Sequence, residues 1–267
     1  MSPRPQTTRK CQLGILTSPQ AQIVFIDTPG VNKIHHKLGE AMNHQARQAL
    51  QDCDLILFVV DAAEAPSDED RVLADWILSL ERQEATSLVV NKIDTVTKNA
   101  LIERLVQYLA LLPQAEVFPV SAVRGDQRQD LLNTLLQRLP EGPMYYPEEQ
   151  VTDLFEREIA ADLIREAALI LLKDEVPHGI AVRVDEYKER SAEMVYIAAT
   201  LFVERETHKG IVIGQNGSML KKIGSAARQE IETLTGQKIY LELRIKVRKN
   251  WRNDENALKA FGFSVKS

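Results

Sequence analysis

Hydrophobic and polar positions alternate in blocks along the first half of the chain. Short apolar runs predict buried strands at 11–16, 22–27, 55–62, 87–94 and 116–122. Between them, apolar residues recur every three or four positions and predict helices at about 38–51, 68–82, 98–112 and 130–139. A tight turn at Ser18-Pro19-Gln20 makes the first two strands an antiparallel pair. Apolar strands separated by amphipathic helices are typical of a parallel sheet with helices on both faces.

The pattern changes after residue 139. Three prolines and a glycine between Leu139 and Pro147 predict a linker. Beyond it we expect a helix at about 152–173, strands at 181–187 and 195–204, a short glycine-rich segment, a helix at 218–234, a strand at 238–248 and a helix at 254–261. The second half is therefore α+β, with a three-stranded sheet and helices on one side. The predicted division is a first domain at 1–140, a linker at 141–151 and a second domain at 152–267.

Composition narrows the class of protein. Hydrophobic residues make up 44% of the 267 and charged residues 27%, as in ordinary soluble domains. No apolar run approaches the ~20 residues that span a bilayer, and the start lacks the pattern of a secretory signal. Two cysteines provide neither a disulfide framework nor a metal framework. These features favour a cytosolic location of the protein.

Charge is unevenly distributed along the chain. The net charge is −5, yet residues 205–252 carry eleven Lys and Arg against four Glu. A basic stretch in an acidic protein suits a polyanionic partner such as nucleic acid. On charge alone, a solvated surface explains the stretch equally well.

Two tetrapeptides at strand ends carry the chemistry of the first half. The sequence Asn91-Lys92-Ile93-Asp94 suits recognition of guanine, because an Asp carboxylate accepts from both N1–H and N2–H. The sequence Asp27-Thr28-Pro29-Gly30 suits the other end of a nucleotide. There the Asp reaches Mg²⁺ and the Gly N–H faces a γ-phosphate. Taken singly, Asp27 also fits a turn and Asp94 a helix cap.

With these motifs in this order, the first half resembles translation-factor-like small GTPases, and the whole chain resembles the Era family of bacterial GTPases. The resemblance implies a P-loop-type α/β GTPase domain that binds GTP or GDP with Mg²⁺. It assigns Gln6-Thr7-Thr8-Arg9 to switch I, with Thr8 and Asp27 at the metal. It assigns Val120-Ser121-Ala122 to a loop whose backbone N–H groups meet guanine O6. Taken alone, Ser121 is equally an ordinary loop residue.

Two departures from the usual GTPase pattern affect the expected activity. Val31 stands where many GTPases carry the Gln that orients the attacking water, although the Era resemblance itself predicts an apolar residue there. The sequence also contains no GxxxxGK[ST] phosphate loop. In the family, that loop and the first strand precede switch I. We therefore expect a truncated domain that folds poorly and is weak or inactive as a GTPase. An in-frame GxxxxGK[ST] is expected roughly 30–40 residues upstream of the Met1 codon.

The second half carries a different motif, Gly214-Gln215-Asn216-Gly217, directly before a basic helix. Two glycines allow the backbone to approach a sugar-phosphate chain, and a helix N-terminus favours phosphate. The α-β-β-α-β order and the GxxG loop resemble a type II KH domain, which binds about four nucleotides. We expect Lys221 and Lys222 to add charge. The predicted apolar groove is lined by Ile211, Ile213, Leu220 and Ile223. A lone GxxG is otherwise a plain turn, and Trp251 is expected in the core.

The family resemblance implies a GTP-binding, GTP-hydrolysing regulator of small ribosomal subunit assembly whose KH domain binds the 3′ region of the small-subunit rRNA. It implies a cytoplasmic monomer, with loose peripheral contact to the inner face of the cytoplasmic membrane. The alternative is a non-enzymatic KH RNA-binding protein whose first half does not bind nucleotide.

Overall fold

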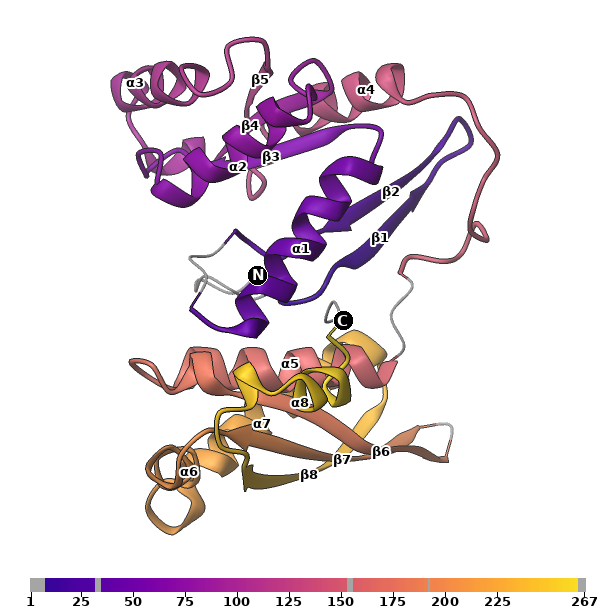
Figure 1. Ribbon diagram of the computed structural model, residues 1–267. Helices are drawn as coiled ribbons and strands as arrows, with labels where there is room; N and C mark the ends of the chain where they lie inside the picture. The colour runs from indigo at the N-terminus through magenta and orange to yellow at the C-terminus, as the bar shows by residue number, and fades with distance from the viewer. Residues whose placement is uncertain (1–7, 32–34, 153–155, 192, 264–267) are drawn as a thin grey trace. The chain divides into compact units, whose positions relative to one another are not determined.

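The structure is a computed structural model that describes residues 8–31, 35–152, 156–191 and 193–263. Its chain divides into two compact units (Figure 1). The N-terminal unit comprises residues 13–33 and 42–152, and the C-terminal unit comprises residues 1–12, 34–41 and 153–267. Each unit is described by itself below.

The elements of the first half alternate as the sequence predicts. In chain order they are β1 (Gln12–Thr17), β2 (Gln22–Asp27), α1 (Lys37–Asp52), β3 (Ile56–Asp61), α2 (Asp68–Ser79), β4 (Thr86–Asn91), the 3₁₀ turn η1 (Ile93–Thr95), α3 (Lys98–Leu109), β5 (Glu116–Pro119) and α4 (Arg128–Arg138). Helix α2 begins where predicted because Ser67 caps it. The Ser67 hydroxyl accepts from the Asp70 backbone N–H, and the Asp70 carboxylate accepts from the Ser67 backbone N–H.

Strands β3, β4 and β5 form a parallel sheet in that order. Residues of β3 and β4 that point to one face, including Phe58 and Leu88, pack against Ile77 of α2 and Tyr108 of α3. On the other face, Val89 and its neighbours pack against α4. This confirms the α/β prediction, with helices on both faces.

Strands β1 and β2 form a separate two-stranded sheet. Among the described residues, no strand is hydrogen-bonded to both β2 and β3, so each has one unpaired edge. Each of these strands carries an exposed apolar side chain: Leu16 on β1 is 43% exposed, Ile26 on β2 is 38% exposed and Val59 on β3 is 57% exposed.

The predicted linker has neither helix nor strand from residue 141 to 151, but it is tied to the β1–β2 hairpin. The Gln22 side-chain oxygen accepts from the backbone N–H groups of Tyr145 and Tyr146, and Ile15 N–H donates to the Val151 carbonyl. The prolines therefore end the preceding helix without leaving this segment detached from its unit.

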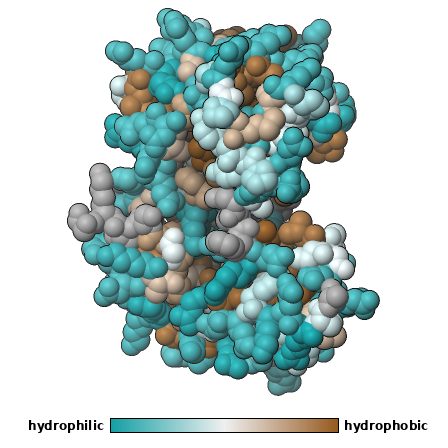
Figure 2. Space-filling view, turned by 90° about the vertical axis from the view of Figure 1, so that its right-hand side faces the viewer, coloured by the Kyte–Doolittle hydropathy of each residue, from teal (hydrophilic) through white to brown (hydrophobic). Residues whose placement is uncertain are grey.

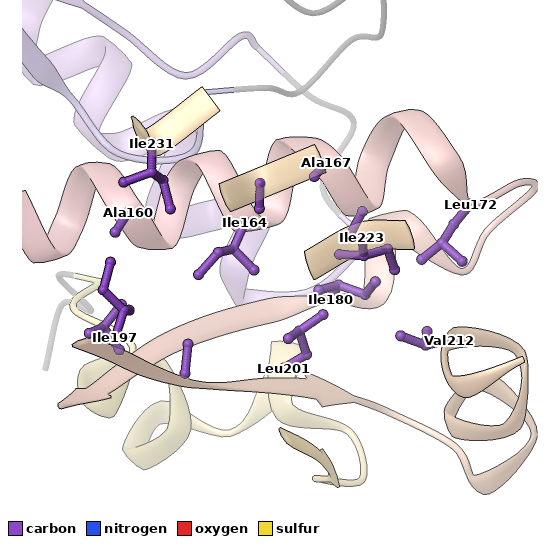
Figure 3. Close-up of a cluster of buried hydrophobic side chains, with 14 of the residues drawn as sticks. Ala160, Ile164, Ala167, Leu172, Ile180, Ile197, Leu201, Val212, Ile223 and Ile231 are labelled. Atoms are coloured by element: carbon purple, nitrogen blue, oxygen red, sulfur yellow. The ribbon is translucent and has the colours of Figure 1, made fainter. Parts of the chain in front are cut away.

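The second half folds as α5 (Glu156–Leu171), η2 (Pro177–Gly179), β6 (Ala181–Ser191), β7 (Met194–Val203), α6 (Glu206–Ile213), η3 (Gln215–Gly217), α7 (Ser218–Thr235), β8 (Lys238–Val247), η4 (Trp251–Asn253) and α8 (Glu255–Ala260). Strand β7 lies at the centre of its sheet, antiparallel to β6 and parallel to β8. Figure 3 shows the core between this sheet and helices α5 and α7, where Ile164 and Ile223 point toward Ile197 and Leu201.

The predicted α-β-β-α-β order was wrong in one respect, because the glycine-rich segment is largely a helix. Helix α6 buries His208 and Val212, four positions apart, on one face. The sequence did not indicate this helix, because Gly210 and the three β-branched residues Ile211, Val212 and Ile213 have low helix propensity. The observed order is α-β-β-α-α-β.

The surface of the molecule on the side drawn in Figure 2 is mostly hydrophilic, with scattered hydrophobic patches. Across the described ranges, no helix has the length and apolar character needed to cross a membrane.

Candidate nucleotide and RNA sites

The Asn91–Asp94 motif lies at the carboxyl end of the parallel sheet. Strand β4 ends at Asn91 rather than at Asp94, because Lys92 adopts a left-handed conformation with φ of 64°. The chain then turns through η1, so the motif occupies a loop instead of the predicted strand. Ligands of open parallel sheets bind at this edge.

Side chains of the motif are held by the loop after β5. The Ser121 hydroxyl donates to Asp94 Oδ1 at 2.6 Å, and the Ala122 N–H donates to Asn91 Oδ1 at 3.1 Å. The hydrogen bond from Ser121, which is fully buried, lowers the pKa of Asp94. Asp94 is therefore ionised and oriented before any ligand arrives, as recognition of guanine requires.

The three backbone N–H groups of this loop have partners within the protein. Val120 donates to the Val90 carbonyl, Ser121 to the Asp126 carbonyl, and Ala122 to Asn91 as above. The expectation that these N–H groups meet guanine O6 stays a prediction.

Sequence reasoning missed Asp61, the last residue of β3. Lys92 Nζ lies 2.7 Å from its carboxylate, and this hydrogen bond raises the pKa of Lys92. The ion pair fixes the Lys92 stem at the sheet edge. The available signal was an acidic residue ending the apolar run ILFVVD, next to the strand that carries the guanine motif.

The Asp27–Gly30 segment follows directly on β2, with Asp27 as its last strand residue. Asp27 and Gly30 are exposed, Pro29 is buried and Thr28 is partly buried. A methyl group placed on Gly30 would meet nothing within 4 Å, so the space around this backbone is open. The described residues contain no cluster of three His, Cys, Asp or Glu side chains that could hold a metal by themselves. A Mg²⁺ ion that takes one carboxylate plus phosphate oxygens needs no such cluster.

Of the four predicted switch I residues, Gln6 and Thr7 lie outside the described residues. Thr8 and Arg9 belong to the C-terminal unit. Arg9 is buried, and its guanidinium donates to the carbonyls of Ile180 at 2.6 Å and His178 at 2.8 Å. Burial lowers the pKa of Arg9 to about 9. The switch I assignment stays a prediction.

The GxxG loop connects α6 to α7 and has the backbone that its glycines allow. Gly214 has φ of 71° and Gly217 has φ of 76°. A Cβ on Gly214 would lie 2.7 Å from the Cβ of Met219, whereas one on Gly217 would meet nothing within 4 Å. Gln215 and Asn216 are exposed between them. The loop therefore presents bare backbone at the start of an 18-residue helix.

The charged and apolar residues beside the loop are only partly as predicted. Lys221 and Lys222 are exposed on α7, and Ile211 is 50% exposed, with Ile213 partly buried. Ile223 is fully buried in the core and does not line a groove, contrary to expectation, because it points from α7 toward the sheet (Figure 3). Trp251 is buried as predicted, with its indole N–H donating to the Gly179 carbonyl.

Comparison with known proteins adds an independent finding. The chain is 42% identical to "GTPase Era" of Heliobacterium modesticaldum over 266 residues, which is 100% of this chain and 88% of that protein. The chain belongs to the GTPase Era family. A second Era, from Geobacter metallireducens, is 45% identical over 98% of this chain and 88% of its own length.

The two halves of the chain match two domain families. Residues 1–92 match the family described as "50S ribosome-binding GTPase", and residues 175–252 match the KH domain family. The chain thus has the Era architecture, a P-loop-type GTPase domain followed by a KH domain.

Solved Era structures have the same fold. One is a crystal structure of Era in complex with MgGDPNP and nucleotides 1506–1542 of 16S ribosomal RNA. Another is Aquifex aeolicus Era Y63A bound to GDP·AlF4⁻. Each has a TM-score of 0.91 and 37% identity, and covers 99% of this chain and 90% of the solved one.

Proposed function

We propose that this chain binds a guanine nucleotide in its N-terminal unit and the 3′ region of small-subunit rRNA through its KH domain. The observation that supports nucleotide binding is the hydrogen bond from Ser121 to Asp94, which holds an ionised carboxylate in place for guanine. The RNA half is supported by the backbone of the GxxG loop and by the Era complex with 16S rRNA nucleotides. We propose that the GTPase domain spans residues 1–140, the linker residues 141–151 and the KH domain residues 152–267.

In this proposal Asp27 of the N-terminal unit holds Mg²⁺, and Thr8 is kept as a second ligand only on the family resemblance, since the structure assigns it to the C-terminal unit. Both offer the hard oxygen atoms that Mg²⁺ prefers, and Asp27 is exposed at a strand end where phosphates can share the ion. When bound, Mg²⁺ would neutralise charge on the phosphates. We propose only weak GTP hydrolysis for this chain, because Val31 stands where many GTPases carry the Gln that orients the attacking water.

A second candidate function rests on the separation of β2 from β3. With one unpaired edge on each strand and Val59 exposed, the N-terminal unit lacks a continuous sheet among its described residues. In this second function the N-terminal unit does not bind nucleotide, and the chain is a non-enzymatic RNA-binding protein. The C-terminal unit does not share this defect, because its three strands form a continuous ladder over a single core.

Exchange of Asp94 for Asn tests the nucleotide site. Guanine presents two donors to Asp94, whereas an Asn would place its own NH₂ against one of them. Xanthine carries a carbonyl oxygen in place of the guanine N2 amine, so Asn can donate to it. In Asp94→Asn we expect at least about tenfold weaker binding of fluorescent GDP, since a charge-assisted hydrogen bond contributes ~1.5–3 kcal/mol. Binding of xanthosine diphosphate should be retained or gained.

Asp75→Asn, on the exposed face of α2, is the matched control and should bind GDP like the parent chain. Equal GDP affinity in Asp94→Asn and Asp75→Asn would remove the guanine assignment. No binding of either nucleotide to the parent chain at millimolar concentration would favour the non-enzymatic function.

A further inference from the structure

The sheet of the KH domain has one face covered by helices and a second face that is open at one end. Alternate residues of β7 enter the core, and Val195, Ile197 and Leu201 are fully buried. The intervening residues point to the other face, as do their paired neighbours on β6 and β8. Toward the end of β7 this face is covered, because Phe202 packs against Phe261 after α8. Toward its beginning, Met194 is 42% exposed and Tyr240 is 59% exposed.

An aromatic stack occupies this open end. Tyr196 and Tyr240 are register partners on β7 and β8, with ring centroids 5.8 Å apart and ring planes at 28°. The Arg190 guanidinium carbon lies 4.5 Å from the centroid of Tyr196 and 5.8 Å from that of Tyr240. The Tyr196 hydroxyl donates to Glu242 at 2.8 Å, which fixes its ring. The Tyr240 hydroxyl has no such hydrogen bond among the described residues, and Tyr240 is 59% exposed.

A β-bulge directs Arg190 onto the rings. Glu189 pairs with Val195 and Ser191 with Met194, so Arg190 is the extra residue of β6. A bulge re-aims a side chain that would otherwise follow the strand's alternation. Among the described side chains, no carboxylate forms an ion pair with Arg190. Its positive charge therefore remains available next to an exposed ring.

The rest of the open face is predominantly basic. The sheet register places Arg183, Lys188, Lys238, Arg244 and Lys246 on it together with Arg190. Of the acidic residues on this face, Glu186, the register partner of Ala198, is exposed, and the other two are engaged internally. Glu242 accepts from Arg244 and Tyr196, and Asp185 accepts from Thr200 and pairs with Arg183. Among the described side chains, Lys188, Arg190, Lys238 and Lys246 form no ion pair, so an exposed aromatic ring lies among cations that outnumber Glu186, the arrangement on which single-stranded nucleic acid stacks its bases.

From this geometry we infer a second RNA-binding surface on the open face of the KH sheet, where an unpaired base stacks on Tyr240 and its phosphates meet Arg190 and the neighbouring lysines. This surface is separate from the GxxG loop and rests on the proposed RNA-binding function. It binds single-stranded RNA without reading its sequence, because every base has a π-face.

An RNA that extends from the GxxG loop to this surface passes around β8 at the edge of the sheet, because α7 packs on the other face. Helix α7 begins at the loop and packs along β8, where a Cβ on Gly224 would lie 3.4 Å from Leu243. Strand β8 is an edge strand of the sheet, and Tyr240 lies near its beginning, shortly after α7 ends. The 18 residues of α7 extend about 27 Å. Four stacked nucleotides, at about 3.4 Å each, cover only about half of this length. The second surface is therefore reached only by a longer RNA.

Dependence on RNA length provides the test. Fluorescence anisotropy would compare the full chain and its variants on labelled single-stranded RNAs of four and about twelve nucleotides at fixed salt. In Tyr240→Ala we expect about tenfold weaker binding of the longer RNA and unchanged binding of the tetranucleotide, since one stacked base contributes ~1–3 kcal/mol. Tyr240→Phe keeps the ring and should bind both RNAs like the parent chain. In Arg190→Gln the slope of log affinity against log salt should fall by about one for the longer RNA only.

Tyr145→Ala removes another exposed tyrosine, which belongs to the N-terminal unit, and should change neither affinity. If Tyr240→Ala leaves the longer RNA bound as tightly as the parent chain does, the surface does not bind RNA and the stack serves packing or a protein partner. Equal weakening on both RNAs would also overturn the inference, because it indicates a general effect on the fold. In both results the parent chain still binds RNA, so the proposed function stands; a parent chain that binds neither RNA overturns both.

Discussion

At the scale of single residues, burial decides what a charged side chain does. Arg9 follows a threonine pair in a polar stretch, and the family resemblance assigns it to switch I. In the structure it is buried, and its guanidinium donates to two carbonyls and lies 6.0 Å from the ring centroid of Trp251. A local sequence pattern does not indicate these partners, because the two carbonyls lie 169 and 171 positions away and Trp251 lies farther still.

His36 shows the same principle with a group that titrates near neutral pH. Its Nδ1 accepts from the Gly39 backbone N–H at 3.0 Å in the first turn of α1, which requires an unprotonated Nδ1. Partial burial, together with the positive charge of Arg252, lowers the pKa of His36. His36 is therefore partly buried and hydrogen-bonded.

Because the folded pKa of His36 lies below its ordinary value of 6.5, the unfolded chain takes up the proton first. Folding is thus unaffected by His36 above that value and becomes less favourable as pH falls from 6.5 through the folded pKa. His36→Asn keeps an acceptor for the Gly39 N–H and does not titrate. Urea unfolding at pH 7.5 and pH 5.5 should show a smaller loss of stability in the variant than in the parent chain. Equal losses would mean that His36 does not contribute to the pH dependence.

At the scale of helices and strands, the sequence was informative wherever an apolar period was long and uninterrupted. Strands β2 and β8 and helices α2 and α7 start where predicted. The prediction failed where the backbone conformation or helix propensity of single residues does not follow the spacing of apolar positions. Lys92 takes a left-handed conformation that ends β4 three residues early, and α6 forms from residues that disfavour helices. Of the candidate nucleotide site, the sequence indicated Asn91, Asp94 and Ser121, but not Asp61, whose role depends on the neighbouring strand.

The connection between α6 and α7 gives a prediction about RNA binding at this scale. Gly214 is a poor site for substitution, because a Cβ would clash with Met219 and destabilise the fold. Gly217 has open space around it and a φ of 76°, which Asn and Asp tolerate better than other side chains. In Gly217→Asp the carboxylate repels phosphate, so we expect at least about tenfold weaker RNA binding in a filter assay. Gly217→Asn has the same shape without the charge.

The comparison between the two variants isolates the electrostatic contribution. Gly217→Asn should bind RNA within about threefold of the parent chain, since it carries the same backbone strain as the Asp variant. Similar affinities for Gly217→Asp and Gly217→Asn would mean that no phosphate approaches this loop.

At the scale of the whole molecule, the two units differ in how completely their sheets are formed. The KH sheet is a ladder of three paired strands above a core of eighteen buried residues. Among its described residues the N-terminal unit has two sheets, and the buried cluster against β3 and β4 contains eleven residues. Local stability follows such differences in burial and hydrogen bonding.

Hydrogen exchange should report this difference directly. We expect amides of β7 to exchange slowest and those on the unpaired edges of β2 and β3 to exchange within the shortest labelling times. In a denaturant series followed by mass spectrometry, the N-terminal unit should open first and the KH domain later. Protection of β2 and β3 equal to that of β7 would show that their free edges are satisfied in solution.

The bare edges of β2 and β3 also have a consequence for the behaviour of many copies together. Within the described part of the chain, each strand has one edge without a partner strand and carries an exposed apolar side chain, Ile26 on β2 and Val59 on β3, so a strand from another molecule can add there. Crowded solutions of this chain should therefore form cross-chain β-structure from the N-terminal unit, while the nucleic-acid-binding end of each copy stays folded and accessible.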